Sequence, residues 1–398
     1  MSIKKIITAK GTKDITTLLG GNVSAQAITL IFTPLIARIY SPESFGAMST
    51  ILSITAVLSV VSCLRYELAI VLPKDEKSAQ NIVALAFLIS ISIFIILNAI
   101  IFIETVSIDL LSFHLKIDYL IWLIPIAVFS NGMKNWLGLW NTRKENFKIL
   151  SISFLIISFT TTGSRVLFGI FFPENSFWLI MGYILGILSG SIYMLYNSFK
   201  DLKREYHAKD IIEALNKYKS FPKYGAANDL INQISQSLPI IFLASCYSSQ
   251  IVGYFGLAYS VLRKPTQLII GSLKSFFLSR IAKKSQECME QRSFWKKSTL
   301  ALSLIGIIPF SILFLWGPAI FTLIFGKNWL IAGEYGSLLS PWLFTAFINP
   351  PSTQLLIVKQ KLKFKLNFEI VSFILRGIAI YTGYHYFNSA YISILFFT

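Results

Sequence analysis

The longest uncharged stretch of the sequence constrains the fold more than any other feature. Residues Ile82–Ile103 form a run of 22 residues without a charge, interrupted only by a few small polar side chains. At 1.5 Å per residue a helix of this length extends about 33 Å, which is enough to cross the hydrocarbon core of a bilayer. The run is too long for a buried helix of a soluble domain and too far from the N-terminus for a signal peptide. It therefore predicts a transmembrane helix.

Similar apolar segments recur along the whole chain, so we expect an all-α polytopic membrane protein. Eleven segments are long enough to span, and a last apolar stretch at 388–398 is too short. We therefore expect an incomplete twelfth helix. The predicted spans are 15–37, 46–64, 82–103, 119–139, 150–172, 177–197, 225–246, 251–279, 298–316, 336–357 and 368–387.

Composition excludes the soluble alternatives. The formal net charge is +17, which could suggest a nucleic-acid-binding protein, but 54% of the residues are hydrophobic and only 14% are charged. So few polar residues could not cover a soluble globule of this size, and so apolar a chain is not disordered. Three widely spaced cysteines do not make a disulfide scaffold. We expect the lipid bilayer, and no nucleic acid, as a partner.

The distribution of Lys and Arg predicts the orientation in the membrane. When the N-terminus is placed inside, the inner segments hold 27 basic residues and the outer loops hold only 3. This asymmetry is the positive-inside pattern, and it predicts a cytoplasmic N-terminus. Because a wrong number of spans would scramble the alternation, the asymmetry also supports the predicted spans.

The longest inner segment divides the predicted spans into two sets of six. We expect an N-terminal six-helix bundle at 1–197, a cytoplasmic connecting segment at 198–224, and a C-terminal bundle at 225–398 with five full spans and a partial one. A shift of 207 residues reveals a faint repeat, and a parallel 6+6 repeat is one transporter architecture. The superposed pairs are Asn22 with Asp229, Gln26 with Gln233, Tyr40 with Tyr247, Ser41 with Ser248, and Gly46 with Gly253.

Several charged residues fall inside the predicted spans. Each costs about 2.5–3.5 kcal/mol at the centre of a membrane helix, so we expect them to face a wet lumen rather than lipid. Lys134 and Lys274 could equally extend to the cytoplasmic surface. The acid, Asp229, is either a proton- or sodium-coupling residue or a counter-ion for a lumen base. Pro265 is expected to kink or unwind its span. The bases are Lys134, Arg165, Arg263, Lys264, Lys274 and Arg376.

Uncharged polar and small residues also recur at helical spacing. The amide and hydroxyl stripes indicate either hydrogen bonds between helices or a hydrated lumen compatible with sugars. The glycine run predicts a close-packing face. The stripes comprise Asn22, Gln26, Thr29 and Thr33 in the first span, and Asn228 or Asp229, Asn232 or Gln233, and Gln236 in the seventh. The glycines are Gly182, Gly186 and Gly190.

Motifs for catalysis and for metal binding are missing from the sequence. It has no phosphate-binding GxxxxGK[ST] loop, no HExxH and no CxxC, and His114, His207 and His385 are not at ligand spacing. The outer loops are short and contain no clustered pair of acids. We therefore expect no catalytic residue, no metal and no cofactor beyond a possible H+ or Na+ coupling ion, which argues against an enzyme.

Seven stretches along the chain form a set that is specific together, although each alone would be weak: Gly20–Asn22, Pro34, Ala37–Gly46, Arg65–Lys74, Val252–Phe255, Pro265 and Phe325–Trp329. Together they resemble the oligosaccharide (O-antigen, Wzx-type) polysaccharide-biosynthesis flippases of the multidrug/oligosaccharidyl-lipid/polysaccharide exporter superfamily. The resemblance covers nearly the whole chain and implies twelve helices in two bundles around a cationic lumen that opens alternately to each side. An incomplete twelfth span departs from that pattern.

The resemblance implies a multi-pass protein of the bacterial inner membrane that moves undecaprenyl-pyrophosphate-linked oligosaccharide units to the periplasmic leaflet. These units would serve O-antigen, lipopolysaccharide or another surface polysaccharide, alongside a polymerase and chain-length machinery. The alternatives are a membrane glycan polymerase or ligase and a multidrug/cation antiporter. We expect the bases to attract the pyrophosphate and the amides to contact sugar. The candidate lumen residues are Arg165, Arg263, Lys264, Arg376, Lys134, Asn22, Gln26, Asn232 and Gln236.

Overall fold

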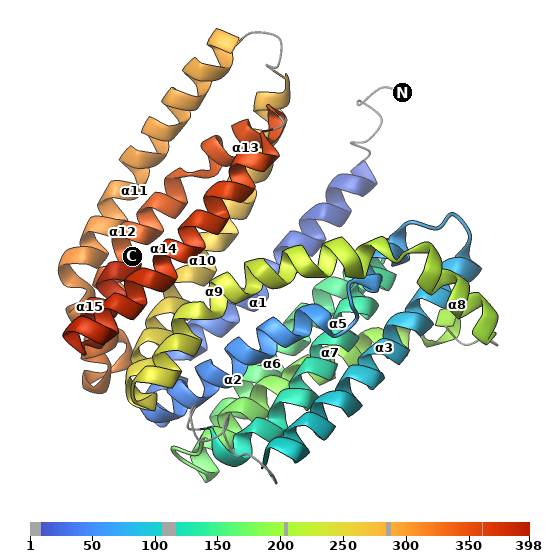
Figure 1. Ribbon diagram of the computed structural model, residues 1–398, viewed down its shortest axis with the longest axis horizontal. Helices are drawn as coiled ribbons and strands as arrows, with labels where there is room; N and C mark the ends of the chain where they lie inside the picture. The colour runs from blue at the N-terminus through green and yellow to red at the C-terminus, as the bar shows by residue number, and fades with distance from the viewer. Residues whose placement is uncertain (1–8, 106–116, 203–205, 284–287, 360) are drawn as a thin grey trace. The chain divides into compact units, whose positions relative to one another are not determined.

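The computed structural model describes residues 9–105, 117–202, 206–283, 288–359 and 361–398 (Figure 1). Within these ranges the chain is helical, with no β-strand. Its contacts divide it into two compact units, Met1–Ser245 and Cys246–Thr398, and each is described by itself. The predicted all-α class is confirmed. The predicted division around 198–224, of which residues 203–205 lie outside the described ranges, stays a prediction.

The first unit is built from long helices with short connections. α6 and α7 pack along one another, α1 packs along α6, and the short α8 packs on α3. The elements are α1 (Ala9–Ile39), α2 (Pro42–Val61), η2 (Tyr66–Val71), α3 (Glu76–Ile103), η4 (Asp118–Trp122), α5 (Leu123–Arg143), α6 (Phe147–Phe171), α7 (Ser176–Leu202), α8 (Ala208–Lys217), η5 (Phe221–Ala226) and α9 (Ala227–Cys246).

The second unit is also built mainly from long helices that pack along one another. α11 packs along α12, α10 contacts both α12 and α13, and α14 packs against α15. The elements are α10 (Ser249–Lys283), α11 (Cys288–Phe325), η6 (Lys327–Trp329), α12 (Leu330–Ile348), α13 (Pro350–Val358), α14 (Leu362–Phe387) and α15 (Ala390–Phe397). With eight residues, or about 12 Å of helix, α15 is too short to span a bilayer.

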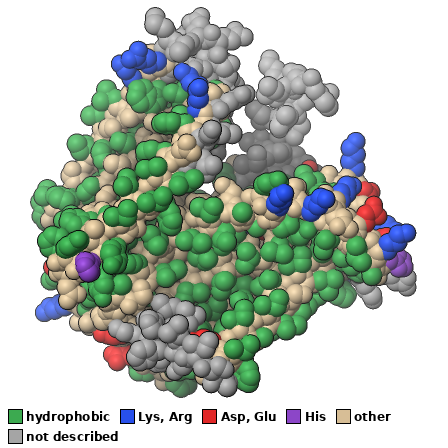
Figure 2. Space-filling view, viewed as in Figure 1, with side chains coloured by type: hydrophobic (Ala, Val, Ile, Leu, Met, Phe, Trp, Pro, Cys, Tyr) green, Lys and Arg blue, Asp and Glu red, His purple; other side chains and the backbone are tan. Residues whose placement is uncertain are grey.

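The helices fit a membrane protein. Six of those in the described ranges are long and apolar enough to cross a bilayer by length and composition alone. Hydrophobic side chains cover the sides of the helices in Figure 2, whereas charged side chains gather at the end of the first unit where α3 and α8 lie. The six are Thr16–Ile39, Pro42–Val61, Glu76–Ile103, Phe147–Phe171, Ser176–Leu202 and Arg292–Phe325.

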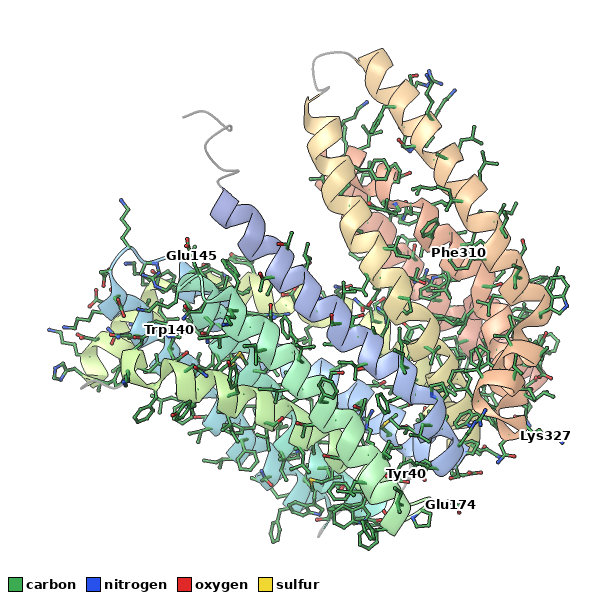
Figure 3. All side chains as sticks on the ribbon, turned by 180° about the vertical axis from the view of Figure 1, so that it is seen from behind. Tyr40, Trp140, Glu145, Glu174, Phe310 and Lys327 are labelled. Carbon is green, nitrogen blue, oxygen red and sulfur yellow. The ribbon has the colours of Figure 1, made fainter. Side chains whose placement is uncertain are left out.

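The two ends of the first unit agree with the predicted alternation of loops. Tyr40 and Glu174, which we predict on the outer side, lie together at one end in Figure 3. Glu145, which we predict on the inner side, lies at the opposite end near Trp140. Which end faces the cytoplasm stays a prediction.

The predicted single span at 336–357 is wrong, because it consists of two helices. α12 ends at Ile348 and α13 begins at Pro350, with Asn349 between them. The reason is the Pro350-Pro351 pair: neither proline has an N–H to donate to a carbonyl one turn back, so the pair fits the first turn of a new helix and not the interior of a long one.

The interruption that we expect at Pro265 of α10 also differs from the structure. α10 is helical throughout Ser249–Lys283, so Pro265 does not unwind it. In α11 the backbone leaves helical geometry at Trp316 (φ −117°, ψ 15°), two residues before Pro318. Pro318 has no N–H to donate to the carbonyl one turn back and its ring clashes with that turn, which accounts for a kink in the turn before it.

Side-chain caps fix where α2 and α3 begin. Ser41 accepts a hydrogen bond from the Ser44 amide at 3.3 Å, and Pro42 occupies the first helical position. Asp75 accepts one from the Ser78 amide at 2.7 Å, and this hydrogen bonding lowers the pKa of the Asp75 carboxyl. Both are standard N-terminal signals of a helix.

The glycine run of α7 is a close-packing face, as predicted. An added Cβ at Gly182 would lie 2.7 Å from Arg165 Cγ, and one at Gly190 would overlap the side chain of Ile157. At Gly186 it would overlap Thr161 Oγ1 and lie 2.9 Å from the Ile157 carbonyl oxygen. The absence of side chains here lets α6 and α7 approach closely.

We expect Gly186→Ala to destabilise the first unit by about 1–3 kcal/mol, because the new methyl group meets backbone as well as side chain. Gly163→Ala in α6 is the matched control, since no atom lies within 4 Å of its added Cβ. Unfolding of purified protein in detergent measures both. Equal stability of the two variants would contradict the packing role of Gly186.

Candidate functional site

The predicted lumen residues occur in both compact units. Seven lie in the first unit, on helices α1, α5, α6 and α9, and three lie in the second, on α10 and α14. Those of the first unit are Asn22, Gln26, Lys134, Arg165, Asp229, Asn232 and Gln236. Those of the second unit are Arg263, Lys264 and Arg376.

Arg165 of α6 is held by uncharged groups. Its Nε donates to the Leu179 carbonyl oxygen at 3.0 Å, and its Nη2 lies 3.3 Å from the Met48 sulfur. The Tyr40 hydroxyl donates to the Arg165 carbonyl oxygen at 2.9 Å, which ties the end of α1 to α6. The guanidinium therefore lies among α2, α6 and α7 with contacts that fix its position and leave its charge in place.

Lys134 of α5 contacts a buried amide. Its Nζ donates to Asn131 Oδ1 at 3.2 Å, one turn toward the N-terminus of the helix. Asn131 Nδ2 in turn donates to the Tyr183 hydroxyl at 3.2 Å and to the Ala127 carbonyl oxygen at 2.8 Å. Lys134 thus reaches away from the C-terminal end of α5, which we predict to be cytoplasmic, and not toward it.

Sequence reasoning missed Asn131 and Tyr183. Asn131 precedes Lys134 by three residues and so shares its helix face, a signal that was available in the sequence. Tyr183 comes from another helix, α7, and its hydroxyl contacts the Asn131 carboxamide. The two residues extend the polar contacts of Lys134 from α5 to α7 within the first unit.

The amide stripes form the same short-range contact in two helices. In α1, Gln26 Nε2 donates to Asn22 Oδ1 at 3.3 Å, and in α9, Gln236 Nε2 donates to Asn232 Oδ1 at 3.0 Å. In each pair the two residues lie one helical turn apart along the same helix. Contact of these amides with a sugar stays a prediction.

The hydroxyl part of the α1 stripe joins two helices. Thr29 Oγ1 and Ser158 Oγ are 3.0 Å apart, and Ser158 Oγ donates to the Ala25 carbonyl oxygen at 2.6 Å. Ser151 Oγ likewise donates to the Thr17 carbonyl oxygen at 2.7 Å. For Thr29, the interpretation as a hydrogen bond between helices is the one that the structure favours.

Asp229 has a basic partner at the start of α9. Its Oδ2 lies 2.8 Å from Arg65 Nε, while Arg65 Nη1 lies 3.3 Å from Glu67 Oε1. Arg65 follows α2 in a left-handed backbone conformation (φ 62°), as does Leu64 (φ 47°). The partner of Asp229 is thus a residue of the predicted inner loop and not one of the six intramembrane bases. A coupling role for Asp229 stays a prediction.

Glu67 is the most buried member of this cluster. Its side chain is 3% exposed, and its Oε2 has no hydrogen-bond partner among the described residues. Burial raises the pKa of the Glu67 carboxyl; the nearby Asp229 acts in the same direction, and Arg65 opposes both. The native state therefore binds a proton at Glu67 more tightly than the unfolded chain does.

A raised native pKa sets the sign of a pH effect. The contribution of Glu67 to stability is fully present below the ordinary carboxyl pKa and is lost as the pH rises through the raised native value. We expect Glu67→Gln, which imitates the protonated form, to become progressively more stable relative to the unmodified protein as the pH rises from the ordinary carboxyl pKa of about 4.3 through the raised native pKa. Thermal unfolding across this range measures the difference, and exposed Glu145→Gln is the control. Parallel pH profiles for the unmodified protein and Glu67→Gln would contradict the assignment.

Arg263 of the second unit lies against an aromatic ring. Its Nη1 donates to the Tyr259 hydroxyl, and its guanidinium carbon lies 4.9 Å from the centre of the Tyr259 ring. The carboxamide oxygen of Gln267, when turned toward Arg263, accepts from Nη2 at 3.0 Å and from Nε at 2.7 Å. Lys264 follows about 100° further around α10, with an exposed side chain.

Arg376 of α14 contacts two further rings. Its guanidinium carbon lies 5.8 Å from the centre of the Trp342 ring and 5.5 Å from that of Phe397. Both are distances at which a cation is attracted to an aromatic face. Trp342 and Phe397 come from α12 and α15, so Arg376 lies where three helices of the second unit meet.

Bases inside and outside the predicted spans differ in their partners. Outside the spans, Lys144 Nζ lies 2.6 Å from Glu76 Oε1, and Arg65 forms ion pairs with Glu67 and Asp229. In the described part of the chain, the intramembrane bases Lys134, Arg165 and Arg376 make no ion pair with a carboxylate. Such an arrangement leaves positive charge available to an anion from outside the chain. Among the described residues, there is no cluster of three or more His, Cys, Asp or Glu side chains that could hold a metal ion.

The fold is that of a membrane transporter. An inward-facing multidrug-resistance MATE-family transporter of the MOP superfamily aligns with a TM-score of 0.70 and 14% identity, covering 94% of this chain and 90% of that one. A MATE protein in complex with MaL6 gives a TM-score of 0.56 and 14% identity over 97% and 92%. A MOP-superfamily transporter from Pyrococcus furiosus, described as having a binding pocket of reverse polarity, gives 0.51 and 16% over 96% and 90%.

The sequence itself identifies the family. The family model described as polysaccharide biosynthesis protein matches residues 35–333, which is most of the chain, so the chain belongs to the polysaccharide biosynthesis protein family. A search of curated protein sequences gives no match. The family model thus links the chain to polysaccharide biosynthesis, and the fold is shared with solved membrane transporters.

Proposed function

We propose that this protein is a flippase that moves lipid-linked oligosaccharide units across the membrane by alternating access. Its cargo would be an undecaprenyl-pyrophosphate-linked repeat unit, carried from the cytoplasmic to the periplasmic leaflet of the bacterial inner membrane. Its product would feed O-antigen, lipopolysaccharide or another surface polysaccharide, with a polymerase and chain-length machinery acting on the far side.

The observation that carries the proposal is the chemistry around the intramembrane bases. Arg165 and Lys134 are held by a carbonyl, a thioether and an amide, and Arg376 by aromatic rings. Burying a cation without a counter-charge costs free energy. Such a cation is therefore expected where it binds an anionic ligand. A lipid pyrophosphate carries at least two negative charges, and arginine offers paired donors that match phosphate oxygens.

The same chemistry argues against a cation antiporter. A transporter of organic cations needs carboxylates to attract its cargo, whereas the predicted spans contain six bases and only one acid well away from a span end, Asp229. That acid is already paired with Arg65. The excess of positive charge favours an anionic cargo.

Transport of a defined lipid-linked oligosaccharide into proteoliposomes tests the proposal directly. We expect the purified protein to expose the labelled glycan to an enzyme on the opposite face of the vesicle, and empty vesicles to show no exposure. A protein that is well incorporated but leaves the glycan on its original face would overturn the proposal.

A deletion strain distinguishes the flippase from a glycan polymerase or ligase. Loss of a flippase traps lipid-linked repeat units on the cytoplasmic leaflet, and this is the result that we expect. Export of single, unpolymerised units after deletion would identify a polymerase instead and contradict the proposed function.

A further inference from the structure

Aromatic side chains of the second unit connect the two arginines that the proposed function uses. The Tyr259 ring stacks on Trp342 with centroids 5.9 Å apart and planes 18° apart. Arg263 lies over Tyr259, and Arg376 lies over Trp342. We call Tyr259 and Trp342 the aromatic bridge, because the two rings stack on one another and each contacts one of the arginines.

Further rings hold the bridge in place. Phe255, one turn before Tyr259 in α10, stacks on Tyr259 with centroids 5.5 Å apart. Phe397 of α15 lies 6.0 Å from Trp342 and contacts Arg376 as well. Because the bridge joins α10 to α12 and reaches α14 through Arg376, it fixes the positions of two cations that come from different helices.

An aromatic face holds a cation in a way that a carboxylate does not. The ring attracts the guanidinium through its quadrupole but carries no net charge, so the arginine remains a full cation. A carboxylate would neutralise the same arginine and compete with an anionic ligand for its N–H groups. Tyr259 is only 8% exposed, so its ring is covered and is not a surface on which a sugar could stack.

We propose that Tyr259 and Trp342 are positioning residues that hold Arg263 and Arg376 as a charged pair for the phosphates of an anionic lipid. This inference rests on the proposed function and deepens it, since it assigns recognition of the pyrophosphate in the second unit to a preorganised pair of guanidinium groups. Preorganisation matters because a free arginine would lose rotamer freedom on binding, and the stacked rings have already restricted it.

Binding of undecaprenyl pyrophosphate to the full-length protein in lipid nanodiscs tests the inference. We expect Trp342→Leu to weaken binding about tenfold, because it removes the ring beneath Arg376 and the stacking partner of Tyr259. Trp342→Phe keeps an aromatic face and should recover most of the affinity. Trp316→Leu is the matched control, since Trp316 lies in the same unit and is 55% exposed. We expect the Trp316→Leu variant to bind undecaprenyl pyrophosphate as tightly as the unmodified protein does.

The outcomes separate this inference from the proposed function. If the unmodified protein does not bind the lipid pyrophosphate, the proposed function fails, and this inference fails with it. If the unmodified protein binds and Trp342→Leu binds equally well, only the positioning role is overturned.

A double-variant comparison distinguishes positioning from a general structural role. In an Arg376→Gln background we expect Trp342→Leu to weaken affinity clearly less than tenfold, because one of the two cations that the bridge positions is gone. A full tenfold loss in that background would show that Trp342 does not act through Arg376 and would overturn the inference.

Fluorinated tryptophans at position 342 provide a test that does not depend on the folding of Trp342→Leu. Successive fluorine atoms weaken the attraction of the ring for a cation while nearly preserving its size. We expect affinity for undecaprenyl pyrophosphate to fall in steps with the number of fluorine atoms. Constant affinity across the series would contradict the role of the bridge.

Discussion

Replacing Arg263 and Arg376 together with glutamine is expected to abolish surface-glycan export by a protein that still reaches the membrane. Each arginine that binds a phosphate through charge-assisted hydrogen bonds contributes about 1.5–3 kcal/mol. Losing two should weaken cargo binding on the order of a hundredfold or more. Glutamine keeps some hydrogen-bonding capacity but removes both charges, so the variant isolates the electrostatic part of recognition.

The matched control is the Lys296→Gln, Lys297→Gln variant. It removes the same net charge from the same unit, but from exposed residues in the part of α11 that we predict to be cytoplasmic. Surface glycan is measured in a deletion strain complemented with each variant, with membrane abundance measured in parallel. We expect normal export from the control. Full export by a well-expressed Arg263→Gln, Arg376→Gln variant would refute the role of these arginines.

The single variants refine this prediction. Arg263 also contacts Tyr259 and Gln267, whereas Arg376 has two aromatic rings beside it. If both arginines contact the same pyrophosphate, the two losses combine less than additively in transport, because one remaining cation already cannot neutralise a dianion. Export measured for each single variant and for the pair gives the coupling between them.

Much of the fold could be predicted from the sequence because membrane spans are determined by long local runs. Ile82–Ile103 needed no partner to be recognised as a span, and it forms most of α3. The break at Asn349 was missed although its signal is local. Pro350 and Pro351 disfavour a continuous helix, but the apolar residues on both sides hide the interruption in a hydropathy profile.

The candidate site was predictable only in part. An intramembrane base such as Arg376 stands out against an apolar helix, so the bases were found directly. Their partners were not, because Tyr259, Trp342 and Phe397 lie far apart in a sequence with 33 phenylalanines, 17 tyrosines and 8 tryptophans. Nothing local distinguishes an aromatic residue beneath an arginine from one that faces lipid. Only tertiary packing selects it.

The Arg65–Asp229 ion pair gives the second prediction with a large effect. Arg65→Asp and Asp229→Arg each place like charges opposite one another in a half-buried position, and Arg65→Asp also faces Glu67. We expect each single variant to lose about 1–3 kcal/mol of stability, more than an exposed pair would and less than a fully buried one. Aspartate tolerates the left-handed backbone conformation at position 65, so strain does not confuse the result.

The control is removal of the ion pair between Lys77 of α3 and Asp210 of α8. Its atoms are 3.5 Å apart and the Lys77 side chain is 64% exposed, so its loss should change stability by less than about 0.5 kcal/mol. Unfolding in detergent measures stability, and glycan export measures transport in the same set of variants. A cost equal to that of the Arg65–Asp229 variants would contradict the importance of burial in this cluster.

Exchanging the two charges separates the two roles considered for Asp229. A counter-ion needs only an opposite charge across the pair, whereas a coupling residue needs a carboxylate at position 229. Because Asp229 lies 2.8 Å from Arg65, we expect the Arg65→Asp, Asp229→Arg variant to regain transport and part of the lost stability, the remainder being the repulsion between the new aspartate at position 65 and Glu67. Regained stability without transport would instead identify the Asp229 carboxylate as the coupling group. Without recovery of either, the pair could not be an independent electrostatic contact, because the exchange conserves both of its charges.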